Sequence, residues 1–287
     1  MFRLNSLKRV FSAIICILVL FCGTVRSMGL QVQVDEKDLS VTDGLPKEIR
    51  NIVILVCDPQ DDNRYSPTGS MMIASVHSST GDAYMTVLQP GLLADMPMAG
   101  RAPLSQAYAL GGENLVMKTL NEQLGLNIRE YLCIDLKRFS GLLEIVGKTE
   151  LKLNESEAAA LGMPAYERIL LNPEQTLDFM RLPRIDPYED RQYRVVMQAL
   201  YQATRERDVL KLTELLQKAL ESIDTNIGFF DMTNLAMKVF GSKVRLETCL
   251  PASVDLISVE GPGLMYITDM DALRRDVHAF IYGSTGK

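Results

Sequence analysis

The stretch of sequence that decides the fold is NIVILVCDPQ, residues 51–60. Residues 52–57 form a continuous apolar run, which the turn residues Asp58 and Pro59 end. A short apolar run closed by turn residues is typical of a central strand. We therefore predict a strand over 52–57 with Asp58 at its carboxyl end, where α/β sheets tend to bind ligands.

The residues that follow alternate between strand and helix patterns. Segments 70–76 and 83–88 are predicted to form a hairpin, and Asn172, Pro173 and Gln175 have the pattern of a helix start with a capping box. Further strands are predicted over 131–136, 149–153 and 244–249, and helices over 113–124, 138–146, 173–182, 189–204, 209–222, 231–240 and 269–281. Such alternation indicates an α/β fold, in which helices cover a sheet.

The N-terminus has the pattern of a membrane anchor or an export signal. Arg3, Lys8 and Arg9 precede the uncharged apolar segment 10–25. We interpret residues 1–27 as a signal-anchor with its N-terminus in the cytoplasm, and cleavage after Ser27 is the alternative. Residues 28–50 are predicted to be a juxtamembrane stalk, and residues 51–283 a single domain outside the membrane.

Charge and cysteine content restrict the function. Without residues 1–27 the chain has 26 basic and 36 acidic residues, a net charge of −10. An acidic domain is unsuited to binding nucleic acid, and it holds any anionic substrate through a local cation cluster or a metal.

The cysteines of this part of the chain, Cys57, Cys133 and Cys249, are odd in number and widely spaced, so no disulfide framework is predicted. Cys57 and Cys133 are interpreted as small buried side chains.

Two groups of charged residues are candidates for a site. Asp58, at the predicted strand end, has the chemistry of a Mg²⁺ ligand, or it simply caps a turn. Arg181, Arg184, Arg191 and Arg194 surround a turn between two predicted helices. They either converge on phosphate groups or pair with acidic neighbours on a solvated face. The sequence contains no G-x-S-x-G elbow, H-E-x-x-H motif or Walker P-loop.

Several blocks, taken in their order and spacing, resemble the LytR–CpsA–Psr (LCP) family of bacterial envelope phosphotransferases. The resemblance covers roughly residues 50–283. The blocks are NIVILVCDPQ, SMMIASV, QAYALGGENLVMKTLNEQLGL, YLCIDLKRFSGLLEIVG, LNPEQTLDFMR, DRQYRVVMQAL and YITDMDALRRDVHAFI. It implies an α/β/α sandwich with a central mixed sheet, and the transfer of a glycopolymer from polyprenyl pyrophosphate to peptidoglycan.

The resemblance also implies roles for single residues. Asp58 matches the first family aspartate, which binds Mg²⁺ and assists catalysis. Arg181, Arg191 and Arg194 match pyrophosphate-binding arginines, and Arg184 is a nearby cation that would replace a lost one.

The chain departs from the family pattern in places that matter for catalysis. Pro67, Thr68 and Gly69 stand where the family has Arg-Ser-Asp, while Pro183 and Val195 replace an arginine and a glutamine. Three hypotheses therefore stay open. They are a divergent transferase, a module that binds polyprenyl phosphate without turnover, and an envelope scaffold.

Overall fold

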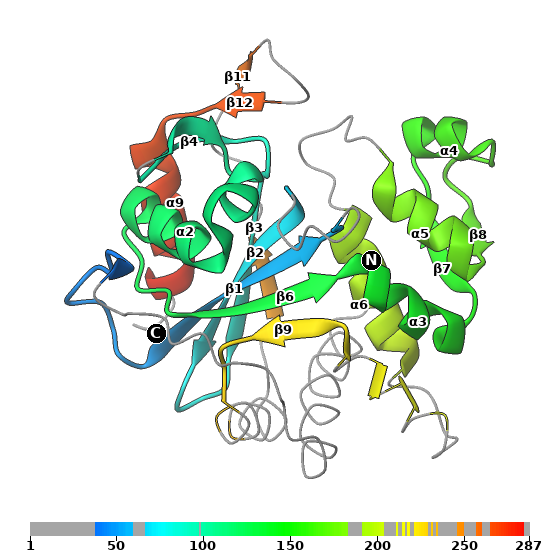
Figure 1. The fold of residues 1–287 in the computed structure, drawn as a ribbon, viewed down its shortest axis with the longest axis horizontal. Helices are drawn as coiled ribbons and strands as arrows, with labels where there is room; N and C mark the ends of the chain where they lie inside the picture. Colours follow the sequence, from blue (N-terminus) through cyan, green and yellow to red (C-terminus); the bar gives the residue numbers. More distant parts are fainter. Residues whose placement is uncertain are drawn as a thin grey trace.

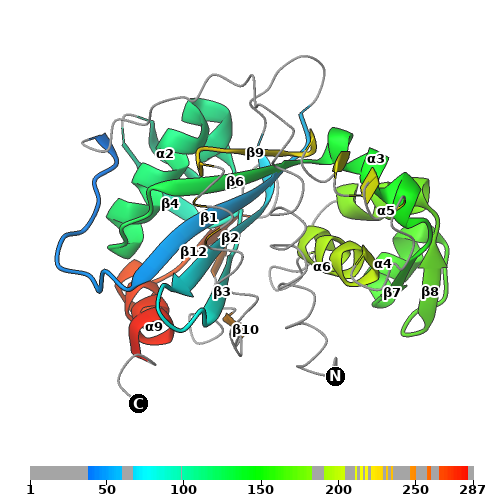
Figure 2. The ribbon, with the colours of Figure 1, turned by 90° about the horizontal axis from the view of Figure 1, so that it is seen from below.

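The computed structural model describes residues 38–59, 67–97, 99–182, 191–203, 246–249, 257–259 and 265–283, together with parts of 211–234. Within these residues the predicted α/β fold is confirmed (Figures 1 and 2). The predicted membrane segment 1–27 lies outside them, as does the first part of the stalk. No helix in the described part of the chain has the length and hydrophobicity needed to span a bilayer.

A mixed six-stranded sheet forms the centre of the molecule, and its strand order is β10-β3-β2-β1-β6-β9. The strands are β1 (Ile49–Cys57), β2 (Thr68–His77), β3 (Ala83–Leu88), β6 (Glu130–Asp135), β9 (Ile223–Thr225) and β10 (Leu246–Cys249). β1 pairs antiparallel with β2 and parallel with β6. The prediction of a central strand ending before Asp58 is therefore confirmed, and so is the β2–β3 hairpin.

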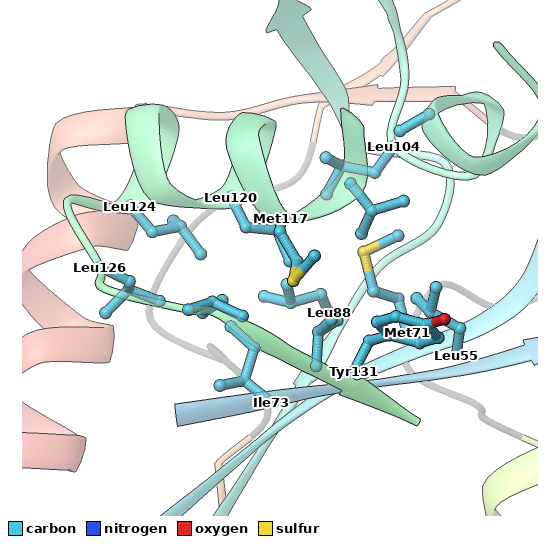
Figure 3. Packing of buried hydrophobic residues seen from close by; sticks show 14 of the residues in the cluster. Leu55, Met71, Ile73, Leu88, Leu104, Met117, Leu120, Leu124, Leu126 and Tyr131 are labelled. Atoms are coloured by element: carbon cyan, nitrogen blue, oxygen red, sulfur yellow. The ribbon is translucent and has the colours of Figure 1, made fainter. Parts of the chain in front are cut away.

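Helices cover both faces of this sheet, because the side chains of β1 alternate between two cores. Val53 and Leu55 face α2 (Gln106–Leu124) and α9 (Met270–Tyr282). Figure 3 shows Leu55, Ile73 and Leu88 below the α2 side chains Met117, Leu120 and Leu124. Val56 faces the second core, formed with α3 (Leu136–Val146), α5 (Pro173–Arg181) and α6 (Arg191–Ala203). Both views place α2 and α9 on one side of the sheet and α3, α5 and α6 on the other.

Small ribbons extend the two sides. β7 (Thr149–Lys152) and β8 (Arg168–Leu171) pair on the α5 side, and α4 (Glu155–Leu161) connects them. The other two ribbons are β4 (Leu93–Met96) with β5 (Gly100–Pro103), and β11 (Ile257–Val259) with β12 (Met265–Ile267). Of these strands only β7 is predicted from sequence, and α4 is not predicted.

Two boundaries differ from the prediction. Residues 38–50 of the predicted stalk pack on the domain, since Leu39 is 1% exposed and its carbonyl oxygen accepts a hydrogen bond from Asn121 Nδ2 at 2.9 Å. Helix α2 begins at Gln106 rather than at residue 113, and it runs through a kink at Gly111 and Gly112. Residues 38–50 are mostly polar, so their packed state depends on contacts distant in sequence, whereas the first part of α2 buries Ala107 and Tyr108 in the core.

Candidate functional site

Asp58 and Arg181 form a bidentate ion pair at the carboxyl end of β1. Arg181 Nε lies 2.7 Å from Asp58 Oδ2, and Arg181 Nη2 lies 2.9 Å from Asp58 Oδ1. The side chains are 20% and 40% exposed, respectively. The hydrogen bonds to the carboxylate raise the pKa of Arg181, so the guanidinium stays charged. The two candidate groups of the sequence therefore meet at this point.

Local sequence explains why Arg181 reaches Asp58. Helix α5 starts in a capping box, in which Asn172 Oδ1 accepts from the Gln175 backbone N–H at 2.8 Å and Gln175 Oε1 accepts from the Asn172 N–H at 3.0 Å. This start confirms the predicted helix N-terminus. Phe179 is fully buried in the second core and fixes the rotation of α5, whose last residue is Arg181.

Arg191 and Arg194 share the carboxylate of Glu157. Arg191 Nε lies 3.1 Å and Arg194 Nη1 2.7 Å from the same oxygen, Oε1. Glu157 is 0% exposed, Arg191 is 5% exposed and Arg194 is 29% exposed. The Arg194 guanidinium also lies over the Phe179 ring, 5.3 Å from its centroid. These two arginines thus pair with Glu157, a buried acid that is not among the acidic neighbours considered from sequence.

Glu157 is the site residue that the sequence analysis misses. It is the third residue of α4, where its Oε2 accepts from the Asn154 N–H at 3.1 Å while Asn154 Oδ1 accepts from the Glu157 N–H at 2.8 Å. The pattern Asn-x-x-Glu is the same capping box that identifies α5. This local signal predicts the helix start, but it does not reveal that the other carboxylate oxygen binds two arginines.

The end of α5 joins these two clusters. Arg191 Nη1 donates to the Leu182 carbonyl oxygen at 3.2 Å, and Gln192 Nε2 lies 3.4 Å from the Met180 carbonyl oxygen. The residues on either side of Arg181 therefore contact the first turn of α6. Arg184 falls within 183–190, outside the described residues.

At Gly69, at the start of β2, the end of the Gln192 side chain occupies the space that a side chain would take. A Cβ atom built there would lie 2.1 Å from Gln192 Nε2 and 2.4 Å from Gln192 Oε1. The space is therefore filled by an amide from α6. This is the position at which the chain departs from the family pattern.

Asp58, the Mg²⁺ ligand expected from sequence, is paired with an arginine in this structure. Both carboxylate oxygens of Asp58 accept hydrogen bonds from Arg181, whose positive charge opposes a cation at that point. Asp135 ends the neighbouring strand β6, but it caps α3 and lies 3.4 Å from Arg138. The described part of the chain contains no group of three His, Cys, Asp or Glu residues suited to a metal. Asp61 and Asp62 lie outside that part.

A model of the LytR_cpsA_psr family matches residues 23–271. The chain belongs to this family. Among its relatives is the polyisoprenyl-teichoic acid–peptidoglycan teichoic acid transferase TagU of Enterococcus faecalis, 26% identical over 67% of this chain and 66% of the relative. The regulatory protein MsrR of Staphylococcus aureus is 28% identical over 67% of this chain and 62% of its own length. This LCP chain therefore spans slightly less than two thirds of these curated relatives.

Solved structures show the same LCP fold. B. subtilis TagV matches with a TM-score of 0.61 at 14% identity, over 83% of this chain and 98% of TagV. A structure described as TagT bound to LI-WTA matches with a TM-score of 0.62 at 13% identity, over 82% of this chain and 91% of that chain. The predicted family is therefore confirmed.

Proposed function

We propose that this LCP protein acts in the bacterial cell envelope, where it holds the pyrophosphate of a polyprenyl-linked anionic glycopolymer. The observation that carries the proposal is Arg181, a charged and 40% exposed guanidinium fixed at the carboxyl end of β1. The TagU relative, whose name describes transfer of teichoic acid to peptidoglycan, supports the substrate class. In an acidic protein such a local cation is the means of binding an anion.

The three arginines have different roles in this proposal. Arg181 uses Nε and Nη2 for Asp58, and a guanidinium carries further N–H donors that reach an anion. Both Arg191 and Arg194 bind Glu157, but Arg194 is 29% exposed and provides a second cation, whereas Arg191 is 5% exposed. We therefore assign pyrophosphate contact to Arg181 and Arg194. Arg191 positions the first turn of α6, a narrower role than the resemblance implies.

One observation favours binding without turnover over transfer. Gly69 stands where the family pattern has an aspartate, and the adjacent space is taken by the neutral amide of Gln192. Asp58, the remaining acid, is neutralised by Arg181. In transfer, a charged and unpaired carboxylate would receive the proton of the attacking hydroxyl, and Mg²⁺ would offset the phosphate charge. Catalysis by this chain is the second candidate function.

The proposal places the domain outside the membrane. Segment 10–25 would anchor it, or would be removed after export, and the acidic domain would face the envelope. Nucleic acid is not part of the proposal, because the net charge of −6 for the whole chain lacks a basic excess.

The test is binding of polyprenyl pyrophosphate in detergent micelles by the full chain. Arg181→Gln is expected to weaken binding about tenfold, since a charge-assisted contact to phosphate is lost. Arg168→Gln is the matched control, because Arg168 also pairs with an acid, Glu150, at 2.8 Å, but on an exposed ribbon. Equal affinities for the two variants would contradict the proposal. Attachment of the label from a glycopolymer lipid to peptidoglycan in the presence of Mg²⁺, with release of polyprenyl monophosphate, would establish transfer.

A further inference from the structure

Two large apolar side chains are exposed on the ribbon formed by β7 and β8. Tyr166, just before β8, is 59% exposed, and Leu170, within β8, is 56% exposed. In the part of the chain that the structure describes, one further large apolar side chain is as exposed, Leu110 in α2. The ribbon therefore carries two of these three side chains within five residues.

The strand register places Leu170 on the outer face of the ribbon. In β7, Thr149 and Leu151 are buried, so Glu150 and Lys152 point away from the core. Glu150 is the cross-strand partner of Leu170. Leu170 therefore lies on the side of the ribbon that is turned away from the second core.

The same outer face carries Tyr166 and two cations. Lys152 Nζ lies 6.0 Å from the centroid of the Tyr166 ring. Arg168, whose side chain is 80% exposed, is the cross-strand partner of Lys152 and forms an ion pair with Glu150 at 2.8 Å. Because that ion pair is neutral, Lys152 gives this face of the two strands a net positive charge.

Tyr166 is held in a backbone conformation that favours glycine or asparagine. Its φ is +60°, and its N–H donates a hydrogen bond to the Leu153 carbonyl oxygen at 2.7 Å. An aromatic residue in the left-handed region is strained, and its exposed ring gains little from packing within the domain. The ring at this position therefore indicates a contact outside the domain.

The chemistry of the outer face fits the surface of an anionic bilayer. A tyrosine ring has an apolar body and a polar tip, which suits the level of the lipid headgroups. A leucine side chain beside it reaches the boundary of the acyl chains, and a lysine ammonium attracts anionic headgroups. A glycan would stack on Tyr166 but would leave Leu170 without an apolar partner.

The length of chain before the described residues keeps a bilayer within reach. Residues 28–37 connect the predicted anchor to Asp38, and ten residues extend to at most about 35 Å. A domain on so short a tether meets the bilayer at high effective concentration, so a small contact surface is enough. Figure 1 shows residues 38–50 and the ribbon at opposite ends of the long axis. Contact at the ribbon would therefore lay this axis along the membrane.

We propose that the outer face of the β7–β8 ribbon, with Tyr166, Leu170 and Lys152, docks on the surface of an anionic bilayer. The inference goes beyond the proposed function and does not depend on it. Arg194 Nη2 donates a hydrogen bond to the Lys152 carbonyl oxygen, so the ribbon is joined to α6. Docking would hold this arginine close to the headgroups.

The experiment uses tryptophan fluorescence, because the chain contains no tryptophan. The full chain with Tyr166→Trp is placed in vesicles of phosphatidylcholine and phosphatidylglycerol whose acyl chains are brominated near the headgroup. The bromine atoms are expected to quench the fluorescence by about half, since an interfacial side chain lies at that depth. Leu110→Trp is the matched control, because Leu110 is 57% exposed but lies in α2 on the other side of the sheet. Its quenching is expected to stay below about a tenth.

Two further substitutions, each combined with Tyr166→Trp, test the neighbouring residues. Leu170→Ser is expected to reduce the quenching, because it removes the side chain that enters the acyl boundary. Lys152→Gln is expected to lower the docking equilibrium about fivefold on vesicles with phosphatidylglycerol and to have no effect on vesicles of phosphatidylcholine alone. Thermal unfolding shows that each variant is folded, which is expected because all the substituted side chains are exposed.

Several results would overturn the inference. These are an unquenched Tyr166→Trp, equal quenching of the two tryptophan variants, or quenching that Leu170→Ser leaves unchanged. A blue-shifted emission of Tyr166→Trp in neutral detergent, together with dimers in analytical ultracentrifugation, would identify a second copy of the chain as the occupant. The vesicles contain no pyrophosphate, so failure of the proposed lipid binding would leave the quenching as it is.

Discussion

Glu157 is a buried carboxylate that pairs with two guanidinium groups. Its Oε1 lies within 3.1 Å of nitrogen atoms of both Arg191 and Arg194, and the glutamate is 0% exposed. A buried charge is tolerated only when its partner is present, because moving an unpaired ion out of water costs several kcal/mol. The start of α6, and with it Gln192, therefore depends on the carboxylate of a different helix.

Replacing Glu157 tests this dependence. Glu157→Gln removes the charge with little change of shape and leaves Arg191 buried beside a neutral group, so we expect a loss of about 3–5 kcal/mol in the free energy of unfolding. Glu150→Gln is the control, because the pair Glu150–Arg168 is 42% and 80% exposed and is expected to contribute less than about 1 kcal/mol. Urea unfolding measures both. Similar losses for the two variants would show that Glu157 has no special role.

At the residue scale, the sequence predicts the candidate residues better than it predicts their partners. Asp58 and Arg181 are separated by 123 positions. The turn residues after the apolar run place Asp58 at the end of a strand, and the capping box places Arg181 near the end of a helix. Glu157 is 34 positions from Arg191 and belongs to an element that the analysis overlooks. Which acid pairs with which arginine is decided by helix packing, which no local pattern contains.

At the element scale, helix α2 is interrupted at a glycine pair. Gly112 has φ +63° and ψ −159°, a backbone conformation that residues with a Cβ scarcely adopt. The kink directs the first turn of α2 over the sheet, where Tyr108 Oη lies 3.6 Å from Cys133 Sγ.

Cys133 and Cys57 are buried free thiols, which confirms the prediction that they are small buried side chains. The Cys57 pKa is raised by its hydrogen bond with Cys133 and by burial, so the thiol remains neutral.

A substitution at the kink tests its geometry. Gly112→Ala forces an L side chain into this conformation and is expected to lower the free energy of unfolding by about 1–3 kcal/mol. Gly141→Ala, in α3, is the control. Its Cβ would lie 3.4 Å from the flexible Lys218 Cδ, and alanine favours a helix, so stability is expected to hold or to rise by up to about 1 kcal/mol. Chemical denaturation gives the free energy of unfolding of both variants. An unchanged free energy of unfolding in Gly112→Ala would mean that α2 straightens at no cost in stability.

Elements with strong local signals are predicted most accurately. The capping box of α5 and the apolar run of β1 lead to bounds close to those of the structure. The first turn of α2 is missed, because Gly111 and Gly112 are typical of a helix start rather than of a kink. Strands β4, β5 and β8 are missed because each has four residues, too short for a periodic pattern, although the equally short β7 is predicted.

At the scale of the whole molecule, sheet order follows from the alternation of elements only in part. The prediction contains the β2–β3 hairpin, but the placement of β10 beside β3 depends on pairing across more than 150 positions. Beyond residue 27 the protein carries a net charge of −10, so the proposed binding of an anionic lipid would depend on a few arginines at one end of the sheet.

Removal of Mg²⁺ separates binding from transfer. Because Arg181 already neutralises Asp58, and no metal-binding group of three acids, cysteines or histidines occurs in the described residues, binding of polyprenyl pyrophosphate is expected to change by less than about twofold when EDTA replaces Mg²⁺. Asp58→Asn keeps the side-chain size but removes the negatively charged partner of Arg181. This variant is expected to bind the lipid as tightly as the unmodified protein or more tightly, because the guanidinium is no longer paired with a carboxylate. A tenfold or larger loss of affinity in EDTA would instead show that a metal completes the site. In that case the Mg²⁺ implied by the family resemblance would apply to this chain, and transfer would become the better reading of its function.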